Sequence, residues 1–160
     1  MKTIYLIGGT MGVGKTTLCQ YMKNNLENVV FLDGDWCWDS HPFIVNEKTK
    51  EMVKDNICHL LNNFIHVDTY EYILFAWVMH EQDIIDDLVS RLDLKDCNLK
   101  VISLVCDEAT LKQHILNDPH RDPEVLERSL QRLPLYDQLN TQKVDITYLT
   151  LEETMQKIIA

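Results

Sequence analysis

The stretch from Gly9 to Thr16 matches the pattern G-x-x-x-x-G-K-[ST], and no other feature limits the fold of this chain so strongly. Glycines let the backbone approach a ligand closely, and the inward N–H groups of such a loop bind phosphate oxygens. The lysine reaches the β and γ phosphates of a nucleotide, and the threonine hydroxyl is a ligand for Mg²⁺. The residues expected to bind ATP are Gly9, Thr10, Met11, Gly12, Val13, Gly14, Lys15, Thr16 and Thr17.

The segments on either side of this loop have the patterns of a strand and a helix. Residues 2–7 are β-branched and apolar, as in a buried parallel strand, and residues 16–26 carry apolar side chains at helical spacing. The loop therefore leads into a helix N-terminus, where the helix dipole favours an anion. A plain glycine-rich turn needs neither Lys15 nor Thr16, so the sequence predicts a phosphate-binding loop.

Composition restricts the class of protein and its partners. The chain has 160 residues, of which 46% are hydrophobic, and its formal net charge is −10. This length is enough for one core, so we expect a single domain over residues 1–160. An acidic surface without a basic stripe repels nucleic acid, which we do not expect as a partner. ATP is still expected, because charges more than about 8 Å from the cationic loop are largely screened.

Nothing in the sequence suggests export or a membrane. There is no apolar run of transmembrane length and no basic-then-apolar signal. The five cysteines are scattered, odd in number and without a Cys-x-x-Cys pair, which argues against a disulfide framework and a structural zinc site. We expect a cytoplasmic protein with reduced thiols and no membrane partner, either a monomer or a homodimer.

Strand and helix patterns alternate along the chain, which is typical of an α/β fold with a parallel sheet. After the first strand and helix, the patterns predict strands at residues 28–32, 72–78, 99–105 and 143–149 and helices at residues 47–64, 81–91, 108–116, 124–132 and 151–159. The expected architecture has three layers, with a five-stranded parallel sheet covered by helices on both faces.

A proline-rich turn interrupts the helical pattern near residue 120. Residues 118–123 read Asp-Pro-His-Arg-Asp-Pro, and two prolines so close together mark a non-helical turn. We expect a short lid around residues 118–133. Arg121 would close over the phosphates, because arginine neutralises charge on a transferring phosphoryl group. Arg128 and Arg132 share one helix face, where Arg128 is expected to be a solvated charge.

Two carboxylates follow the second predicted strand, in the sequence Leu32-Asp33-Gly34-Asp35. Ligands of parallel α/β sheets bind beyond the carboxyl ends of the strands. In an extended strand, Asp-x-Asp points both side chains to the same side. We expect Asp33 to help Thr16 hold Mg²⁺, and Asp35 to accept the proton of an acceptor hydroxyl. A turn built on the Asp-Gly dipeptide is the alternative.

These motifs resemble those of the small-molecule kinases built on the phosphate-loop fold, a group that includes shikimate, gluconate and adenylylsulfate kinases. Residues 31–35 are similar to the Leu-Asp-x-Asp segment of these kinases. Residues 132–136 and 144–145 are similar to the Arg-x-Pro-Leu-Tyr and Val-Asp segments of shikimate kinases. The resemblance implies ATP and Mg²⁺ as cofactors, Asp33 and Asp35 as the acids that organise Mg²⁺ and activate the acceptor, and Arg132 as a ligand for an anionic group of the acceptor.

The acceptor segment departs from the shikimate kinases. They carry Gly-Gly-Gly at the end of the third strand, where residues 75–79 read Phe-Ala-Trp-Val-Met. Their lid arginine stands among glycines, whereas Arg121 stands between two prolines. Shikimate is therefore not the expected acceptor. Trp36, Trp38 and His41 follow the acid pair, and stacking in an acceptor pocket and covering the core are equally compatible with their positions.

The expected function is ATP-dependent transfer of a phosphoryl group to a small-molecule hydroxyl or phosphate acceptor. One alternative is a nucleoside monophosphate kinase, whose substrate suits the anion ligand Arg132 but not a short lid. Another is a nucleotide-binding protein that regulates, or confers resistance by sequestering a ligand, without phosphotransfer. The pair Asp33 and Asp35 weighs against that alternative, because simple binding needs no base.

Overall fold

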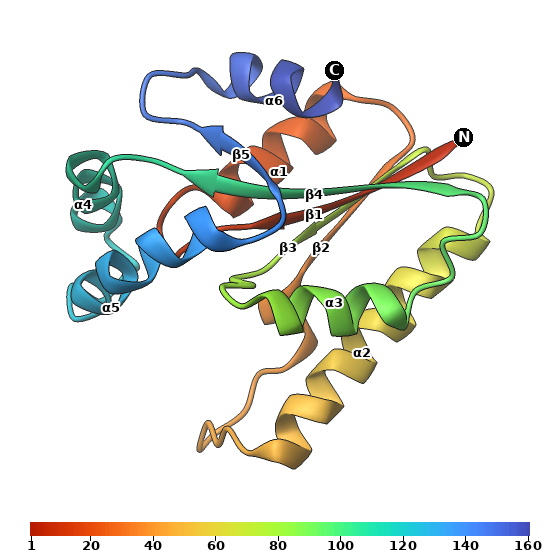
Figure 1. The fold of residues 1–160 in the computed structure, drawn as a ribbon, viewed down its shortest axis with the longest axis horizontal. Helices are drawn as coiled ribbons and strands as arrows, with labels where there is room; N and C mark the ends of the chain where they lie inside the picture. The colour runs from red at the N-terminus through yellow and green to blue at the C-terminus, as the bar shows by residue number, and fades with distance from the viewer.

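The computed structural model covers residues 1–160 and shows a central sheet between two layers of helices (Figure 1). The strands are β1 (Lys2–Gly8), β2 (Val29–Asp33), β3 (Tyr72–Ala76), β4 (Cys97–Val105) and β5 (Gln142–Asp145). The α-helices are α1 (Lys15–Asn25), α2 (Glu47–His66), α3 (Gln82–Ser90), α4 (Glu108–Asn117), α5 (Val125–Arg132) and α6 (Leu151–Ile159). Two 3₁₀ helices are η1 (Gly34–Cys37) and η2 (Leu133–Gln138). No helix is both long and apolar enough to cross a membrane.

The five strands form one parallel sheet in the order β2-β3-β1-β4-β5. The predicted architecture is thus confirmed. β1 lies in the middle, where Ile7 pairs with Ala76 of β3 on one side and with Ile102 of β4 on the other. The chain adds strands first on one side of β1 and then on the other. This reversal opens a crevice beyond the carboxyl end of β1, the usual ligand site of such sheets.

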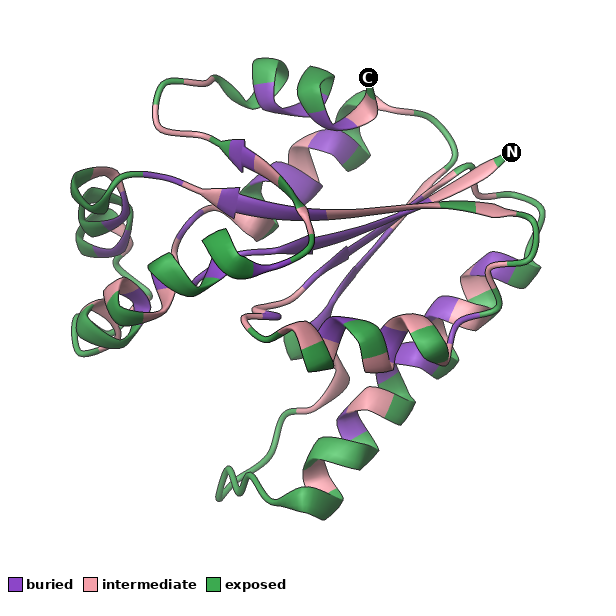
Figure 2. Ribbon diagram, viewed as in Figure 1, coloured by how far each residue is buried: buried purple, intermediate pink, exposed green.

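Most of β1 is buried (Figure 2), and its alternate side chains enter two hydrophobic cores, one on each face of the sheet. Tyr5 and Ile7 face the core formed with α1, α4 and α6, whereas Ile4 and Leu6 face the core formed with α2, α3 and η2. This period of two is the geometry of a strand buried on both faces. The five cysteines are free, as the sequence predicted.

Helices α4 and α5 lie beyond the carboxyl ends of the strands, beside the arrowhead of β4 (Figure 1). The chain reaches α4 from β4 through Asp107, whose carboxylate accepts from the N–H of Thr110 and caps the helix. Residues 118–124 then connect α4 to α5, which ends at Arg132 before Pro134, as expected for a helix that meets proline. This connection places residues 118–132 at the edge of the sheet where ligands bind.

The last predicted strand was too long. β5 ends at Asp145, whereas the sequence predicted a strand over residues 143–149. The Asp145 carboxylate accepts hydrogen bonds from the N–H and hydroxyl of Thr147, and Leu149 N–H donates to the Ile146 carbonyl. These local bonds turn the chain away from the sheet toward α6, which the apolar spacing alone did not reveal. The third strand likewise ends two residues earlier than predicted, at Ala76.

Charged side chains join α2 to α3 at the surface. Arg91 follows α3, and its guanidinium lies 3.0 Å from Asp87 Oδ1 and 2.8 Å from Glu51 Oε1 of α2. Lys54 of α2 donates to the other oxygen of Asp87. Hydrogen bonds from Arg91 and then from Lys54 hold the pKa of Asp87 below its usual value. The network therefore favours the charged form of Asp87 in the folded protein.

We predict that Asp87→Asn lowers the free energy of unfolding by about 1 kcal/mol at pH 7, the scale of a surface ion pair. Because the folded-state pKa of Asp87 is depressed, its contribution is complete above the unfolded pKa and is lost as the pH falls through the folded pKa. Urea unfolding at pH 7 and below pH 4 should show that the difference in free energy of unfolding between the parent protein and Asp87→Asn becomes smaller in acid. Asp68→Asn, at an exposed carboxylate outside the network, is the control. A difference that stays constant with pH would contradict this role.

Candidate active site

Three glycines of the loop after β1 have backbone angles that other residues rarely adopt. The φ angles are 155° at Gly9, 85° at Gly12 and 113° at Gly14. Gly14 caps α1 without any side-chain bond, and the first turn of α1 contains no acidic residue. The N–H groups at this end of α1 therefore have no side-chain acceptor and remain available to an anion.

Side-chain packing fixes two of these glycines as well. A Cβ atom at Gly12 would lie 2.5 Å from Ile115 Cγ1 of α4, and one at Gly9 would lie 2.7 Å from Val13 Cγ1. Real Cβ atoms do not approach other atoms so closely. The loop is thus pressed against α4, and this contact holds its open side toward the carboxyl end of the sheet.

Lys15 folds back over the loop. Its Nζ donates to the carbonyls of Gly9 at 2.7 Å and Thr10 at 3.1 Å. Burial lowers the pKa of Lys15 to about 8, although Asp35 and Asp33 oppose the shift, while the charge of Arg121 adds to it. A phosphate group in this place would favour the charged form of Lys15 and offer it a stronger acceptor than a carbonyl.

Thr16 and Asp33 form a pair of oxygen ligands. The Thr16 hydroxyl donates to Asp33 Oδ2 at 2.9 Å, and Asp33 is buried at the end of β2. No group of three or more His, Cys, Asp or Glu side chains offers a complete protein site for a metal. Mg²⁺ fits the pair, because it usually takes one or two protein oxygens and completes its shell with phosphates and water.

Asp35 lies near Asp33 but not in the predicted way. The chain enters η1 at Gly34, and Asp33 Oδ1 accepts from the N–H of Asp35 at 2.9 Å. The extended Asp-x-Asp geometry was therefore wrong, because the Asp33 side chain caps a turn. Although Asp35 is partly exposed, desolvation of its carboxylate, followed by the charge of Asp33, raises the pKa of Asp35, whereas Lys15 and Arg121 oppose the shift. A carboxylate in this setting is a stronger proton acceptor than a free one.

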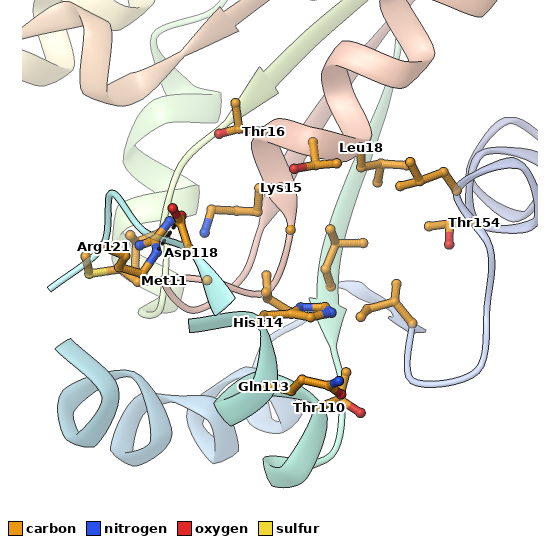
Figure 3. A pocket seen from close by; sticks show the side chains of 18 of the residues that line it. Met11, Lys15, Thr16, Leu18, Thr110, Gln113, His114, Asp118, Arg121 and Thr154 are labelled. Atoms are coloured by element: carbon orange, nitrogen blue, oxygen red, sulfur yellow. Dashed lines mark ion pairs between the residues drawn. The ribbon is translucent and has the colours of Figure 1, made fainter. Parts of the chain in front are cut away.

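These groups face one cavity of about 750 Å³ (Figure 3). The phosphate loop and α1 form one wall, α4 and the segment after it a second, and the turn between β5 and α6 a third. The residues that line it are Met11, Gly12, Val13, Gly14, Lys15, Thr16, Thr17, Leu18, Asp33, Asp35, Trp77, Val78, Leu104, Thr110, Gln113, His114, Asn117, Asp118, Arg121, Ile146, Thr147, Leu149, Leu151 and Thr154.

Arg121 reaches this cavity from the connection between α4 and α5. In Figure 3 its guanidinium lies on the same side of the cavity as Lys15 and Met11. Its Nε is 3.6 Å from Asp118 Oδ2, and this buried nitrogen has no hydrogen-bond partner. The cavity thus brings together two cations, Lys15 and Arg121, with a donor on Arg121 left unused.

Some predicted residues lie outside the cavity. Gly9 donates its N–H to the Val78 carbonyl, and the side chain of Thr10 is directed to Ser129 of α5, so neither lines the wall as expected. Arg132 lies beside His80 and Tyr136, where its charge helps to lower the pKa of His80, a shift caused mainly by burial. Ser129 had no signal in the sequence, because a lone serine in a helix carries no recognisable pattern.

The aromatic residues after the acid pair also lie outside the cavity. Trp36 packs on Phe31 with ring centroids 5.1 Å apart and is 57% exposed. Trp38 packs on Phe43 at 4.5 Å, and His41 is exposed. Neither tryptophan lines the cavity that holds Asp35, and Trp38 adds to the core on the α2 face. Arg128 is exposed, as predicted, with a nitrogen 3.7 Å from Met11 Sδ.

Comparison with known proteins agrees with this architecture. The family profile described as "AAA domain" matches residues 6–133. No curated protein sequence matches the chain.

Among solved structures, a gluconokinase from Sinorhizobium meliloti 1021 has a TM-score of 0.70 and 16% identity. The match covers 99% of this chain and 90% of the gluconokinase chain. The Deinococcus radiodurans tunicamycin resistance protein has a TM-score of 0.70 and 14% identity, covering 99% and 94%. Shikimate kinase from Bacteroides thetaiotaomicron has a TM-score of 0.63 and 17% identity, covering 97% and 95%. Identities this low show a shared fold.

We predict that Gly12→Ala weakens the binding of Mg·ADP at least tenfold, roughly the effect of 1–2 kcal/mol of left-handed backbone strain added to a steric clash. The new Cβ would meet Ile115, and φ would have to leave its present value of 85°. Calorimetry would measure the affinity, and circular dichroism would establish that the variant is folded. Gly8→Ala is the control, because its Cβ would have no neighbour closer than 3.5 Å. Unchanged affinity in Gly12→Ala would show that the loop conformation does not determine binding.

Proposed function

The chain belongs to the AAA domain family, and we propose that it is an ATP-dependent phosphotransferase that acts on a small-molecule hydroxyl or phosphate acceptor. One observation carries the proposal. Lys15 and Thr16 from the loop and α1, Asp33 and Asp35 from the end of β2, and Arg121 from the connection between α4 and α5 all face the same cavity. Simple nucleotide binding needs the loop, but it does not need a second carboxylate with a raised pKa beside it.

The shape of the cavity supports one orientation of ATP. The phosphates would lie at the N-terminus of α1, where free N–H groups and Lys15 meet. The base would lie between α4 and the turn before α6. Apolar walls there come from Leu104 and Ile146, and polar groups from Gln113 and Thr147. The mixture of apolar surface and a few polar groups is typical of nucleotide pockets.

Thr16 and Asp33 would hold Mg²⁺. When bound, the ion neutralises charge on the phosphates. Lys15 would exchange its loop carbonyls for phosphate oxygens, and Arg121, whose Nε has no partner, would add a second cation. Catalysis would then rest mainly on positioning and charge neutralisation, which are the main terms in phosphoryl transfer.

The acceptor would approach from the end of β3. If the acceptor is a hydroxyl, Asp35 would accept its proton. If the acceptor is a phosphate, the charge of Asp35 would orient the cation that accompanies this phosphate. Arg132 supports an acceptor with an anionic group, since this half-buried cation has no ion-pair partner. The buried Nδ1 of the neighbouring His80 also has no hydrogen-bond partner. His80 follows Val78 by two residues, and Val78 lines the cavity and accepts a hydrogen bond from Tyr136, which lies near Arg132.

The names of structurally similar proteins favour phosphotransfer over simple binding. They include a gluconokinase, a sugar kinase and a shikimate kinase. Structural similarity to the tunicamycin resistance protein supports a resistance function as a second candidate. We propose further that residues 1–160 act as one domain with a lid around residues 118–133, in the cytoplasm, as a monomer or homodimer.

A screen for ligand-induced thermal shifts tests this function. The protein would be mixed with Mg²⁺, a non-hydrolysable ATP analogue and single members of a metabolite library that includes nucleoside monophosphates. A true acceptor stabilises the folded state by about RT ln(1 + [L]/Kd). Hits would then be assayed for ADP release with ATP. Transfer to a nucleoside monophosphate would select that subclass, whereas ATP binding without any phosphorylated product would overturn the proposal.

We predict that Lys15→Met keeps the fold but lowers kcat at least about a hundredfold, the scale on which loss of one charge-stabilising donor acts. The reason is that methionine fills a similar volume but brings no charge to the transferring phosphoryl group. Coupled measurement of ADP release would give kcat, and thermal unfolding would report the fold. Near-normal turnover would refute the role of Lys15.

We predict that Asp35→Asn lowers kcat by about a hundredfold or more, the range of general base catalysis. Mg·ADP affinity should stay within about threefold, because Asp33 and Thr16 remain to hold the ion. Asp39→Asn is the matched control, since Asp39 is exposed and does not line the cavity. Equal losses of kcat in the two variants, or a loss confined to ADP binding, would show that Asp35 is not the proton acceptor.

A further inference from the structure

A buried pair of hydroxyl groups joins the phosphate loop to α5. Thr10 has no exposed surface, and Ser129 is 1% exposed. Thr10 Oγ1 donates to the Ser129 carbonyl at 2.8 Å and lies 2.9 Å from Ser129 Oγ. Ser129 Oγ in turn donates to the carbonyl of Met11. One serine therefore holds two consecutive residues of the loop.

This contact lies at the most buried position of α5. Ser129 is the only buried residue of the helix, whereas Leu126 and Leu130 are partly buried against the core. Helices in globular proteins are usually held by an apolar stripe. Here a polar side chain occupies the most buried position and donates its one hydroxyl proton to the loop, at the Met11 carbonyl. Packing of α5 alone does not require that arrangement.

The loop needs such support when a ligand binds. The Thr10 carbonyl accepts from Val13 N–H at 3.2 Å and from Lys15 Nζ at 3.1 Å. If Lys15 turns to a phosphate, Thr10 loses one of these bonds, and the loop must keep its shape without it. The bonds from α5 do not involve Lys15, so they persist in both states of the lysine.

We propose that Ser129 is a positioning residue that keeps Thr10 and Met11 in the phosphate-binding conformation before the ligand arrives. The identity of that ligand, a nucleotide, rests on the function proposed above. Ser129 does not line the cavity and touches no reacting atom. It acts through the loop backbone, by reducing the ordering that binding would otherwise demand.

Two variants and a control test the proposal. Ser129→Ala removes the bond from the serine hydroxyl to the Met11 carbonyl, and Thr10→Val removes the bond from the loop hydroxyl to the Ser129 carbonyl while keeping the shape of the side chain. Ser103→Ala is the matched control, because Ser103 is also 1% exposed and shares a 2.7 Å bond with Thr141, but it lies outside the cavity. Amide hydrogen exchange at residues 11–14 would be measured in the free protein, and calorimetry would give the Kd for Mg·ADP.

Ser129→Ala and Thr10→Val should each speed exchange at residues 11–14 and raise the Kd about five- to tenfold, the effect of one or two lost hydrogen bonds. The double variant should be less than multiplicatively worse, because the two hydroxyls touch each other and stabilise the same stretch of the loop. Ser103→Ala should lower Tm but change neither the exchange rates nor the Kd.

If Ser129→Ala and Thr10→Val leave exchange and Kd within twofold of the parent, the proposal is wrong. If the variants bind ADP more weakly but the protein never transfers phosphate, the positioning role of Ser129 is upheld and only the proposed phosphotransferase function is overturned.

Discussion

The free N–H groups at the start of α1 are the feature on which the rest of the site depends. They exist because Gly14 begins the helix in a left-handed conformation and supplies no side-chain acceptor. The centre of the sheet then fixes where these donors point. β1 lies between β3 and β4, so the loop that follows it opens into the crevice where the strand order reverses. Carboxylates that follow β2, Lys15 from the loop and Arg121 from residues 118–124 meet there, around one cavity.

Local electrostatics outweigh the charge of the whole protein at this place. The chain carries a formal net charge of −10, yet Lys15 and Arg121 line the cavity that Asp33 and Asp35 also line. Water and salt screen the distant acidic surface. Burial is the main reason why the pKa of Lys15 falls to about 8, and the charge of Arg121 adds to the shift. An anion in the cavity would favour the charged form of Lys15, so the acidic surface does not conflict with the proposed nucleotide.

Most of the fold and the centre of the site were predictable from the sequence. Strands and helices of this chain are separated by clear turn residues, and the loop motif implies both its neighbours and its ligand. The predictions that failed concern segments in which a side chain hydrogen-bonds to nearby backbone. Asp33 caps the turn that contains Asp35, and Asp145 ends β5 early. Such bonds compete with the strand and leave no trace in hydrophobic periodicity. Ser129 escaped notice for another reason, because its partners, Thr10 and Met11, lie more than a hundred residues away.

The position of Lys15 in the free protein has a consequence for release as well as for capture. Its ammonium group already has two carbonyl partners, Gly9 and Thr10. A phosphate that left would therefore not strand a bare charge, since the lysine could return to acceptors that the main chain provides. The same backbone that would receive the ligand thus competes with it for one cation. Under the proposed function, such internal competition would weaken the hold on a product and favour its release.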